Sequence, residues 1–138
     1  MKLDEIIQYC GEEYVSNTKC HHAIVEIPDF RFMEYKTRNG ETVASIAEER
    51  KISRYMIMEN NRFLSNSRKS LGTMNIKIPT CYAKRFDIYI DCENLIPTAL
   101  KVYDGKGLYE SFKFTEIVLD ASFHPDEFDR SYPEYGFR

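Results

Sequence analysis

The sequence predicts an α+β fold in which a strand-helix-helix-strand unit lies between an N-terminal helix and strand and a C-terminal antiparallel β-meander. Three observations predict it. Residues 35–79 place two capped helical patterns between two extended stretches. Residues 85–114 form three runs of strand-like residues separated by turn residues. The 138 residues, 43% of them hydrophobic, suffice for one domain or for two small lobes that share a core.

The N-terminal segment, residues 1–34, predicts one helix followed by one strand. Helical spacing relates the apolar residues Leu3, Ile6, Ile7, Cys10 and Tyr14, although Gly11 weakens the end of such a helix. After the polar VSNTK, the stretch CHHAIVEIP is rich in β-forming residues and ends at Pro28. We expect this segment to pack with the C-terminal sheet.

The central segment, residues 35–79, predicts strand, helix, helix and strand in that order. An extended piece at Tyr35–Thr37 is followed by a turn at Asn39-Gly40, and Thr42 and Ser53 are placed to cap the two helices. Asn60-Asn61 ends the second helix, and MNIKIP forms the second strand. Antiparallel pairing of the strands, with both helices on one face, would bury the apolar residues Val43, Ile46, Ala47, Tyr55, Met56, Ile57, Met74, Ile76 and Ile78.

The C-terminal segment, residues 80–138, predicts an antiparallel meander and an aromatic tail. In AKRFDIYID, three apolar residues alternate with Asp87, Tyr89 and Asp91, which places the two aspartates on the exposed face of a half-buried strand. Asp104-Gly105-Lys106-Gly107 predicts a tight hairpin between the next two strands. The many aromatic residues indicate either two covered faces or one covered face and a broad apolar surface. Residues 122–138 have no period, and we expect them to pack as an extended tail.

Residues 35–79 resemble the LysM family of glycan-binding modules over both strands and both helices. The resemblance rests on Tyr35, Gly40-Glu41-Thr42-Val43, Ser45-Ile46-Ala47, Ile52-Ser53, Ile57, Asn60, Leu71-Gly72, Ile76 and Ile78-Pro79. Glu41 stands where the family usually has aspartate, Val43 where it has leucine, and Gly72 is followed by Thr73-Met74.

This resemblance implies binding of polymers that contain N-acetylglucosamine, such as peptidoglycan or chitin, in a shallow groove between two loops. The implied ligand-binding residues are Asn39, Gly40, Glu41, Thr42 and Val43 in the first loop, and Asn61, Arg62, Phe63 and Leu64 in the second. Backbone groups would bond the acetamido group, and Phe63 would meet the sugar face. The alternative is that Gly40 only turns the chain, Thr42 only caps the helix, and Phe63 packs against the neighbouring sheet.

A second stretch is similar to the C-terminal part of an envelope family of unknown function related to LolA-like lipoprotein carriers of Gram-negative bacteria. The similarity spans Pro97 to Phe114 and the Glu127–Asp129 triplet. It implies a curved antiparallel sheet and a location in the periplasm or cell envelope. Envelope proteins or lipoproteins are the partners that it implies.

Charge is unevenly distributed along the chain. The net charge is −4 over residues 1–34, +5 over residues 35–79 and −4 over residues 80–138. The basic residues are scattered, without the clustered lysine, arginine and aromatic residues of a nucleic-acid surface, so we expect no nucleic-acid partner. No run approaches the roughly 18 apolar residues of a membrane span. The four cysteines have no CxxC spacing and are expected to be core residues or at most one disulfide pair.

Catalytic motifs are weak in this sequence. Cys20-His21-His22 is the one tempting group, but neighbouring strand residues point to opposite faces, so only Cys20 and His22 would share a face. No phosphate loop, nucleophile elbow or dinucleotide fingerprint occurs. We therefore expect a non-catalytic envelope protein, with no cofactor or metal site, that binds peptidoglycan through residues 35–79. The alternative is a structural or lipoprotein-interaction domain that binds no sugar.

Overall fold

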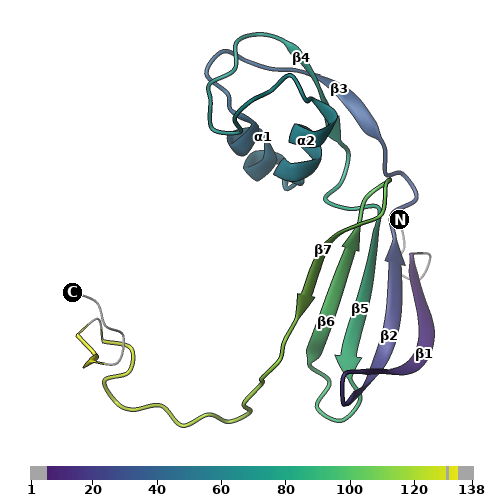
Figure 1. Cartoon of the computed structure of the whole chain (residues 1–138), viewed down its shortest axis with the longest axis vertical. Helices are drawn as coiled ribbons and strands as arrows, with labels where there is room; N and C mark the ends of the chain where they lie inside the picture. Colours follow the sequence, from purple (N-terminus) through teal and green to yellow (C-terminus); the bar gives the residue numbers. More distant parts are fainter. Residues whose placement is uncertain (1–5, 130, 134–138) are drawn as a thin grey trace.

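The computed structural model describes residues 6–129 and 131–133 and has a mixed α+β fold. Within this part of the chain, five strands form one antiparallel sheet, and two more strands form a smaller sheet that carries two helices. The smaller unit lies at the end of the larger sheet where the hairpin joins β6 to β7 (Figure 1).

The larger sheet has the strand order β1-β2-β5-β6-β7, and all its neighbouring strands are antiparallel. Its strands are β1 (Ile7–Val15), β2 (Thr18–Glu26), β5 (Arg85–Asp91), β6 (Pro97–Tyr103) and β7 (Leu108–Lys113). The predicted strand before Pro28 and the predicted meander are confirmed. Asp104 accepts hydrogen bonds from the backbone N–H groups of Lys106 and Gly107 in the predicted hairpin turn.

The predicted N-terminal helix is wrong, because residues 7–15 form the edge strand β1. This strand pairs with β2 from Ile7 to Val15, so its backbone hydrogen bonds are made within the sheet. The register shifts between Tyr9 and Gly11, and Gly11 has a φ of 100°. A glycine with positive φ suits such a bulge and opposes a helix. Leu3 lies outside the described residues.

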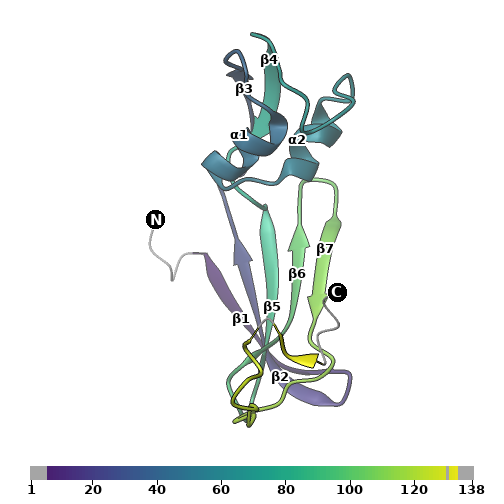
Figure 2. The same ribbon diagram turned by 90° about the vertical axis from the view of Figure 1, so that its left-hand side faces the viewer.

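The smaller unit consists of β3 (Phe32–Lys36), α1 (Val43–Arg50), α2 (Arg54–Asn60) and β4 (Asn75–Pro79). Strands β3 and β4 are antiparallel, and both helices lie on the same side of them (Figure 2). Both predicted helix caps are confirmed. The Thr42 side chain accepts from the Ser45 backbone N–H at 3.0 Å, and Ser53 accepts from the Met56 N–H at 3.4 Å.

The main hydrophobic core lies inside this smaller unit. Its fully or nearly fully buried apolar residues come from both helices, β4 and the connecting loops: Val43, Ile46, Ala47, Ile52, Ile57, Leu71, Ile76 and Ile78. Tyr35 of β3 is partly buried against this cluster. Met56 is also buried, as predicted. The expectation of burial is wrong for Tyr55, which is 51% exposed, and for Met74, which precedes β4 and is also exposed.

The smaller unit is an insertion between two strands that pair with each other, because β2 and β5 are direct neighbours in the sheet. The chain leaves β2 and returns to β5 through two adjacent connections. The Ile27 N–H donates to the Lys84 carbonyl at 2.8 Å, and the Thr80 N–H donates to the Arg31 carbonyl at 2.9 Å. These hydrogen bonds hold both ends of the insertion together.

The prediction that Asp87 lies on an exposed face is wrong, because Asp87 is 4% exposed. The Arg85 guanidinium donates to both of its carboxylate oxygens, at 2.6 and 2.9 Å, and the Tyr103 hydroxyl lies 3.4 Å away. These long neighbouring side chains shield the carboxylate from water. The apolar residues on the other face of β5 are only partly buried, because the two described helices pack on the smaller sheet.

The extended tail predicted over residues 122–138 does not pack against the sheet in its first described part, residues 122–126. Between Phe114 and Asp126 every residue is exposed, and Figure 1 shows this segment extending away from the sheet. Short turns follow, in which the Glu127 N–H donates to the His124 carbonyl. Residues 130 and 134–138, the rest of the predicted tail, lie outside the described residues.

Candidate functional site

The loops that precede α1 and follow α2 are joined by backbone hydrogen bonds. The Gly40 N–H donates to the Leu71 carbonyl at 3.2 Å, and the Leu71 N–H donates to the Glu41 carbonyl at 2.7 Å. The Ala44 N–H donates to the Ser67 carbonyl at 2.9 Å. The first turn of α1 and the chain between α2 and β4 therefore form a continuous surface.

Most of the first predicted ligand loop is used to build the fold. The Glu41 carboxylate accepts from the Arg38 N–H at 2.7 Å and from the Tyr35 hydroxyl at 2.9 Å. The pKa of the Glu41 carboxyl is held below its usual value, mainly by the hydrogen bond from the Arg38 N–H and to a smaller extent by the one from the Tyr35 hydroxyl. Thr42 is occupied by the helix cap, and Val43 is fully buried.

Gly40 also has a backbone role, because its φ of 91° is a conformation that favours glycine. Asn39 is exposed. Within the first predicted loop, Asn39 thus remains the side chain most open to a ligand.

The second predicted ligand loop is divided between buried and exposed residues. Asn61 is 3% exposed, and its side-chain amide bonds the Ile57 carbonyl and both backbone groups of Lys77. Leu64 packs against the core. Arg62 and Phe63 are exposed, and Phe63, at 67% exposure, does not pack against the sheet as the alternative expected.

A groove of about 1070 Å³ lies beside the predicted loops rather than over them. Its walls come from α1, the corner between the helices, α2 and the following loop; they include Ala44, Ala47, Glu48, Ile52, Ser53, Arg54, Tyr55, Met58, Ser65, Asn66, Ser67 and Arg68. Tyr82 and Glu110 of the sheet unit complete it. None of the nine predicted residues lines this groove, although Ala44 and Ser65 directly follow the two predicted loops.

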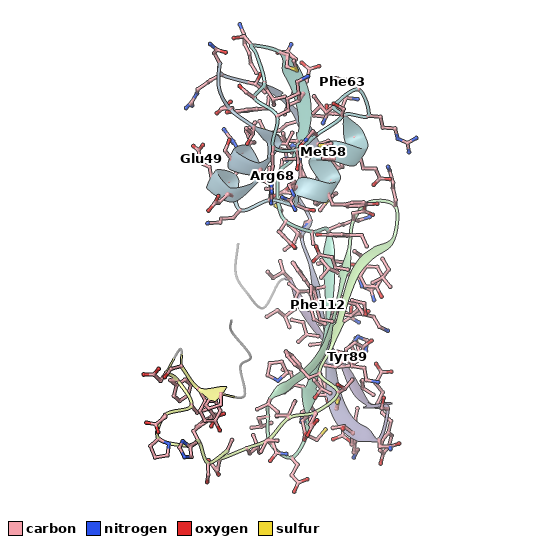
Figure 3. All side chains as sticks on the ribbon, turned by 60° about the vertical axis from the view of Figure 1, so that its left-hand side comes forward. Glu49, Met58, Phe63, Arg68, Tyr89 and Phe112 are labelled. Carbon is pink, nitrogen blue, oxygen red and sulfur yellow. The ribbon has the colours of Figure 1, made fainter. Side chains whose placement is uncertain are left out.

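Phe63 lies at a different part of the smaller unit from Met58 and Arg68 (Figure 3). Together with Asn61 it lines a separate hollow of about 160 Å³ beside β4. The two predicted loops meet in the core, where Val43 is buried and Leu64 packs against the same cluster. Of their exposed residues, Phe63 lines the small hollow, whereas Asn39 and Arg62 line neither hollow.

One end of the groove is a tyrosine-rich junction between the smaller unit and the sheet. The Tyr55 and Tyr109 rings stack with centroids 5.7 Å apart and planes 9° from parallel. The Tyr109 hydroxyl donates to the Tyr82 carbonyl at 2.7 Å, and burial raises the pKa of the Tyr109 phenol. The Tyr82 hydroxyl donates to the Glu110 carboxylate at 2.9 Å. This junction fixes the position of two partly exposed aromatic rings at the groove.

The groove offers hydrogen-bonding groups and apolar contacts, which suits a neutral polar ligand. Ser65, Asn66 and Ser67 supply hydroxyl, amide and backbone groups, while Met58 supplies an apolar wall. Ser65–Ser67 directly follow the second predicted loop and are not among the predicted ligand-binding residues. Tyr82 and Glu110 were not predicted either, because their proximity to the helices depends on tertiary structure.

A second notable surface is one face of the larger sheet. Two rungs of paired residues cross all five strands on this face: Ile7, Val25, Phe86, Val102 and Glu110, and Tyr9, Ala23, Ile88, Leu100 and Phe112. Nine of these ten residues are apolar or aromatic, and Ile7, Tyr9 and Phe112 are about half exposed. The face is therefore the broad apolar surface that the sequence analysis left as one of two alternatives.

Comparison with known proteins provides no family and no function for this chain. Among the described residues, no helix has the length and apolar character needed to cross a membrane. A scan against protein-family models, a search of curated proteins and a search of solved structures found no match for this chain.

Proposed function

We propose that this protein binds glycans containing N-acetylglucosamine, such as peptidoglycan, through the groove of its LysM-like strand-helix-helix-strand unit. The observation that carries the proposal is the position of the groove at the joined loops that precede α1 and follow α2, where Ala44 bonds Ser67. The resemblance of residues 35–79 to LysM modules implies a ligand between residues 39–43 and 61–64, and the groove begins at Ala44 and Ser65, which directly follow these two loops. The role is non-catalytic, and its setting is the cell envelope.

The chemistry of the groove supports a sugar ligand. An acetamido group has one donor and one acceptor, which the Ser65–Ser67 stretch can match with hydroxyl and amide groups. The faces of pyranose rings are weakly apolar and can lie against Met58 and the exposed parts of Tyr55 and Tyr82. Ligands of this kind are fixed by a few polar groups within a largely preformed concave site.

The test is a titration of the full chain with soluble N-acetylglucosamine oligomers, combined with a pull-down on insoluble peptidoglycan. Wild-type protein should bind both. Arg68→Ala removes an exposed side chain from the groove and should weaken binding several-fold, while the thermal midpoint changes little. Absence of binding by a protein with an intact circular dichroism spectrum contradicts the proposal.

Arg62→Ala is the matched control, because Arg62 is also an exposed arginine near α2 but does not line the groove. It should leave binding unchanged. If Arg62→Ala and Phe63→Ala weaken binding while Arg68→Ala does not, the ligand lies at the second predicted loop, and the groove is the wrong site.

The open face of the larger sheet favours a second candidate function, the binding of lipoprotein acyl chains. Its two apolar rungs contain one charged residue, Glu110 at the edge, so the surface suits hydrocarbon better than peptide. This agrees with the implied LolA-like relationship. A fluorescent fatty acid should bind wild-type protein and lose affinity for Phe112→Asp, whereas Phe63→Asp should have no effect. Equal affinity for all three proteins refutes this candidate.

A further inference from the structure

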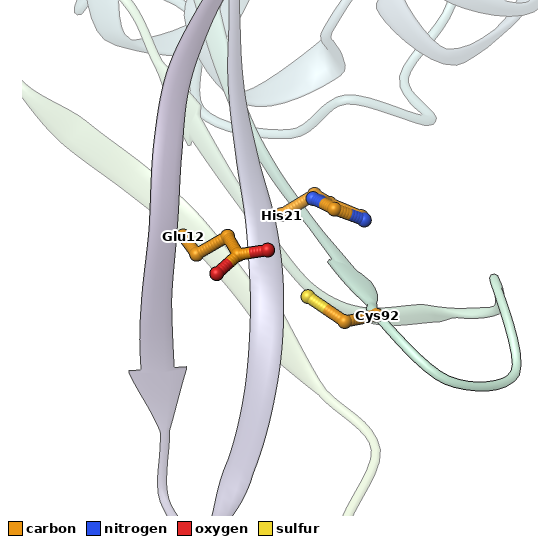
Figure 4. A group of neighbouring side chains, drawn as sticks. All are labelled: Glu12, His21 and Cys92. Carbon is orange, nitrogen blue, oxygen red and sulfur yellow. The ribbon is translucent and has the colours of Figure 1, made fainter.

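Three potential metal ligands from distant parts of the chain converge beside the edge of the larger sheet. Glu12 is in β1, His21 is in β2, and Cys92 directly follows β5. One ligand atom from each side chain lies within 4.8 Å of the corresponding atoms of the other two (Figure 4). This is the one such group of three among the described residues.

The strand register explains why these residues meet. Glu12 and His21 are direct partners in the pairing of β1 with β2, so their side chains leave the same face of the sheet. The Cys92 N–H donates to the Lys19 carbonyl at 3.0 Å, which brings the end of β5 alongside β2 two residues before His21. The sheet backbone therefore fixes all three attachment points.

The three side chains form a ligand set that zinc accepts. Thiolate, imidazole and carboxylate are its usual protein ligands, and three protein ligands leave a fourth position for water. Tetrahedral zinc with normal bond lengths holds its ligand atoms about 3.4–3.6 Å apart. Side-chain rotations that bring the ligand atoms closer by at most about 1.4 Å would reach this spacing.

Open space for a fourth ligand adjoins one of the three side chains. A hollow of about 520 Å³ is lined by Cys92 together with Lys19 and two acidic residues that favour a cation, Asp91 and Glu93. The Lys19 ammonium pairs with the Glu12 carboxylate, and a metal ion would displace it. Lys19 is half exposed, so its ammonium can move into water when a metal ion replaces it.

We infer that Glu12, His21 and Cys92 form a binding site for zinc or a similar borderline-soft divalent metal ion. Binding releases the thiol proton of Cys92 as the sulfur becomes a thiolate ligand. The ion joins β1, β2 and the end of β5, and thereby fastens the edge strand β1 to the sheet. His21 is held nearby by a 3.1 Å hydrogen bond between its Nδ1 and the Tyr9 hydroxyl. Such outer contacts orient histidine ligands.

Titration of the reduced full chain with Co²⁺ tests this inference, because a thiolate ligand gives cobalt a charge-transfer absorption band in the near ultraviolet. One equivalent of Co²⁺ should produce the band, and Zn²⁺ should displace it. Cys92→Ser should abolish the band and lower affinity at least about 100-fold, and Glu12→Gln should lower affinity about 10-fold or more. Cys10→Ser is the matched control, because Cys10 is an exposed thiol in β1 that does not belong to the group of three, and it should keep the band.

A second measurement covers the case in which Cys92→Ser does not fold. Zn²⁺ should raise the thermal midpoint of the wild-type protein and of Cys10→Ser, but not that of His21→Gln. Two results overturn the inference: no thiolate band with wild-type protein at equimolar Co²⁺, or an equal Zn²⁺-induced shift in wild type and His21→Gln.

Discussion

Replacement of Asn61 by alanine separates a structural role from a ligand-binding role in the second predicted loop. The resemblance to LysM modules assigns Asn61 to ligand binding, whereas its side chain is almost completely buried. The Nδ2 group donates to the Ile57 and Lys77 carbonyls, each at 2.7 Å, and Oδ1 accepts from the Lys77 N–H at 2.8 Å. Asn61 therefore connects the end of α2 to β4.

The expected cost follows from the groups that Asn61→Ala leaves without a partner. One N–H and two carbonyls lose short hydrogen bonds, and a buried group without a partner costs about 1–3 kcal/mol. Water can reach part of this region through the adjoining hollow, so the costs will not add fully. We expect a loss of about 2–4 kcal/mol, which corresponds to a fall of roughly 10 °C in the thermal midpoint.

Urea unfolding followed by far-ultraviolet circular dichroism measures this loss. Asn39→Ala is the matched control, because Asn39 is an exposed asparagine in the first predicted loop and should cost less than about 0.5 kcal/mol. A loss below 1 kcal/mol for Asn61→Ala would refute the reasoning, since it would mean that the amide is not needed to connect α2 and β4. The side chain would then be available for a ligand.

Three further predictions concern the other loop residues. Thr42→Ala should lower the free energy of unfolding by about 1 kcal/mol because it removes a helix cap, whereas Thr42→Ser should keep most of the wild-type stability. Equal thermal midpoints for wild type and Thr42→Ala would contradict the capping role. Phe63→Ala should change the unfolding free energy by less than about 0.5 kcal/mol because the ring is exposed, and a larger loss would show that it packs. Glu41 has a lowered pKa in the folded protein, so its stabilising contribution is complete above the ordinary glutamate pKa of about 4.3 and is lost as the pH falls below that value. Glu41→Gln should therefore flatten the acid side of the stability profile, and an unchanged slope would contradict the role of the Arg38 hydrogen bond.

The smaller unit could be predicted in detail because its signals are local. A threonine or serine before each helical pattern, a glycine turn and an alternating strand before Pro79 act over a few residues, and the structure contains both caps and both strands. Tyr55 and Met74 fit the apolar patterns and are nevertheless exposed. Tyr55 stacks on Tyr109 from the sheet, and no local pattern encodes that contact.

The larger sheet was harder to predict because long-range pairing decides it. The apolar spacing of residues 3–14 fits a helix, but pairing with β2 satisfies the backbone of β1 instead. Alternation in β5 identified a strand and its two faces, but not which face is more buried. Burial of Asp87 depends on Arg85, on Tyr103 of the next strand, and on the position of the helices over the smaller sheet.

In the candidate site, too, some features follow from local sequence and others depend on tertiary structure. Sequence resemblance pointed to two loops, and the groove lies beside them, where Ala44 meets Ser67. Tyr82 and Glu110 enter it because the smaller unit is inserted between two paired strands. Likewise, Glu12, His21 and Cys92 come together through strand register and are not recognisable as one group in the linear sequence.

The most direct test of the glycan-binding proposal is an amide NMR titration of the isotopically labelled chain with a soluble N-acetylglucosamine oligomer. The proposal predicts saturable shift changes concentrated at Ala44, Tyr55 and the Ser65–Arg68 segment, which line the groove. Resonances of β1 and β2 should not move. A spectrum that stays unchanged at high oligomer concentration, or changes confined to the larger sheet, would contradict the proposal.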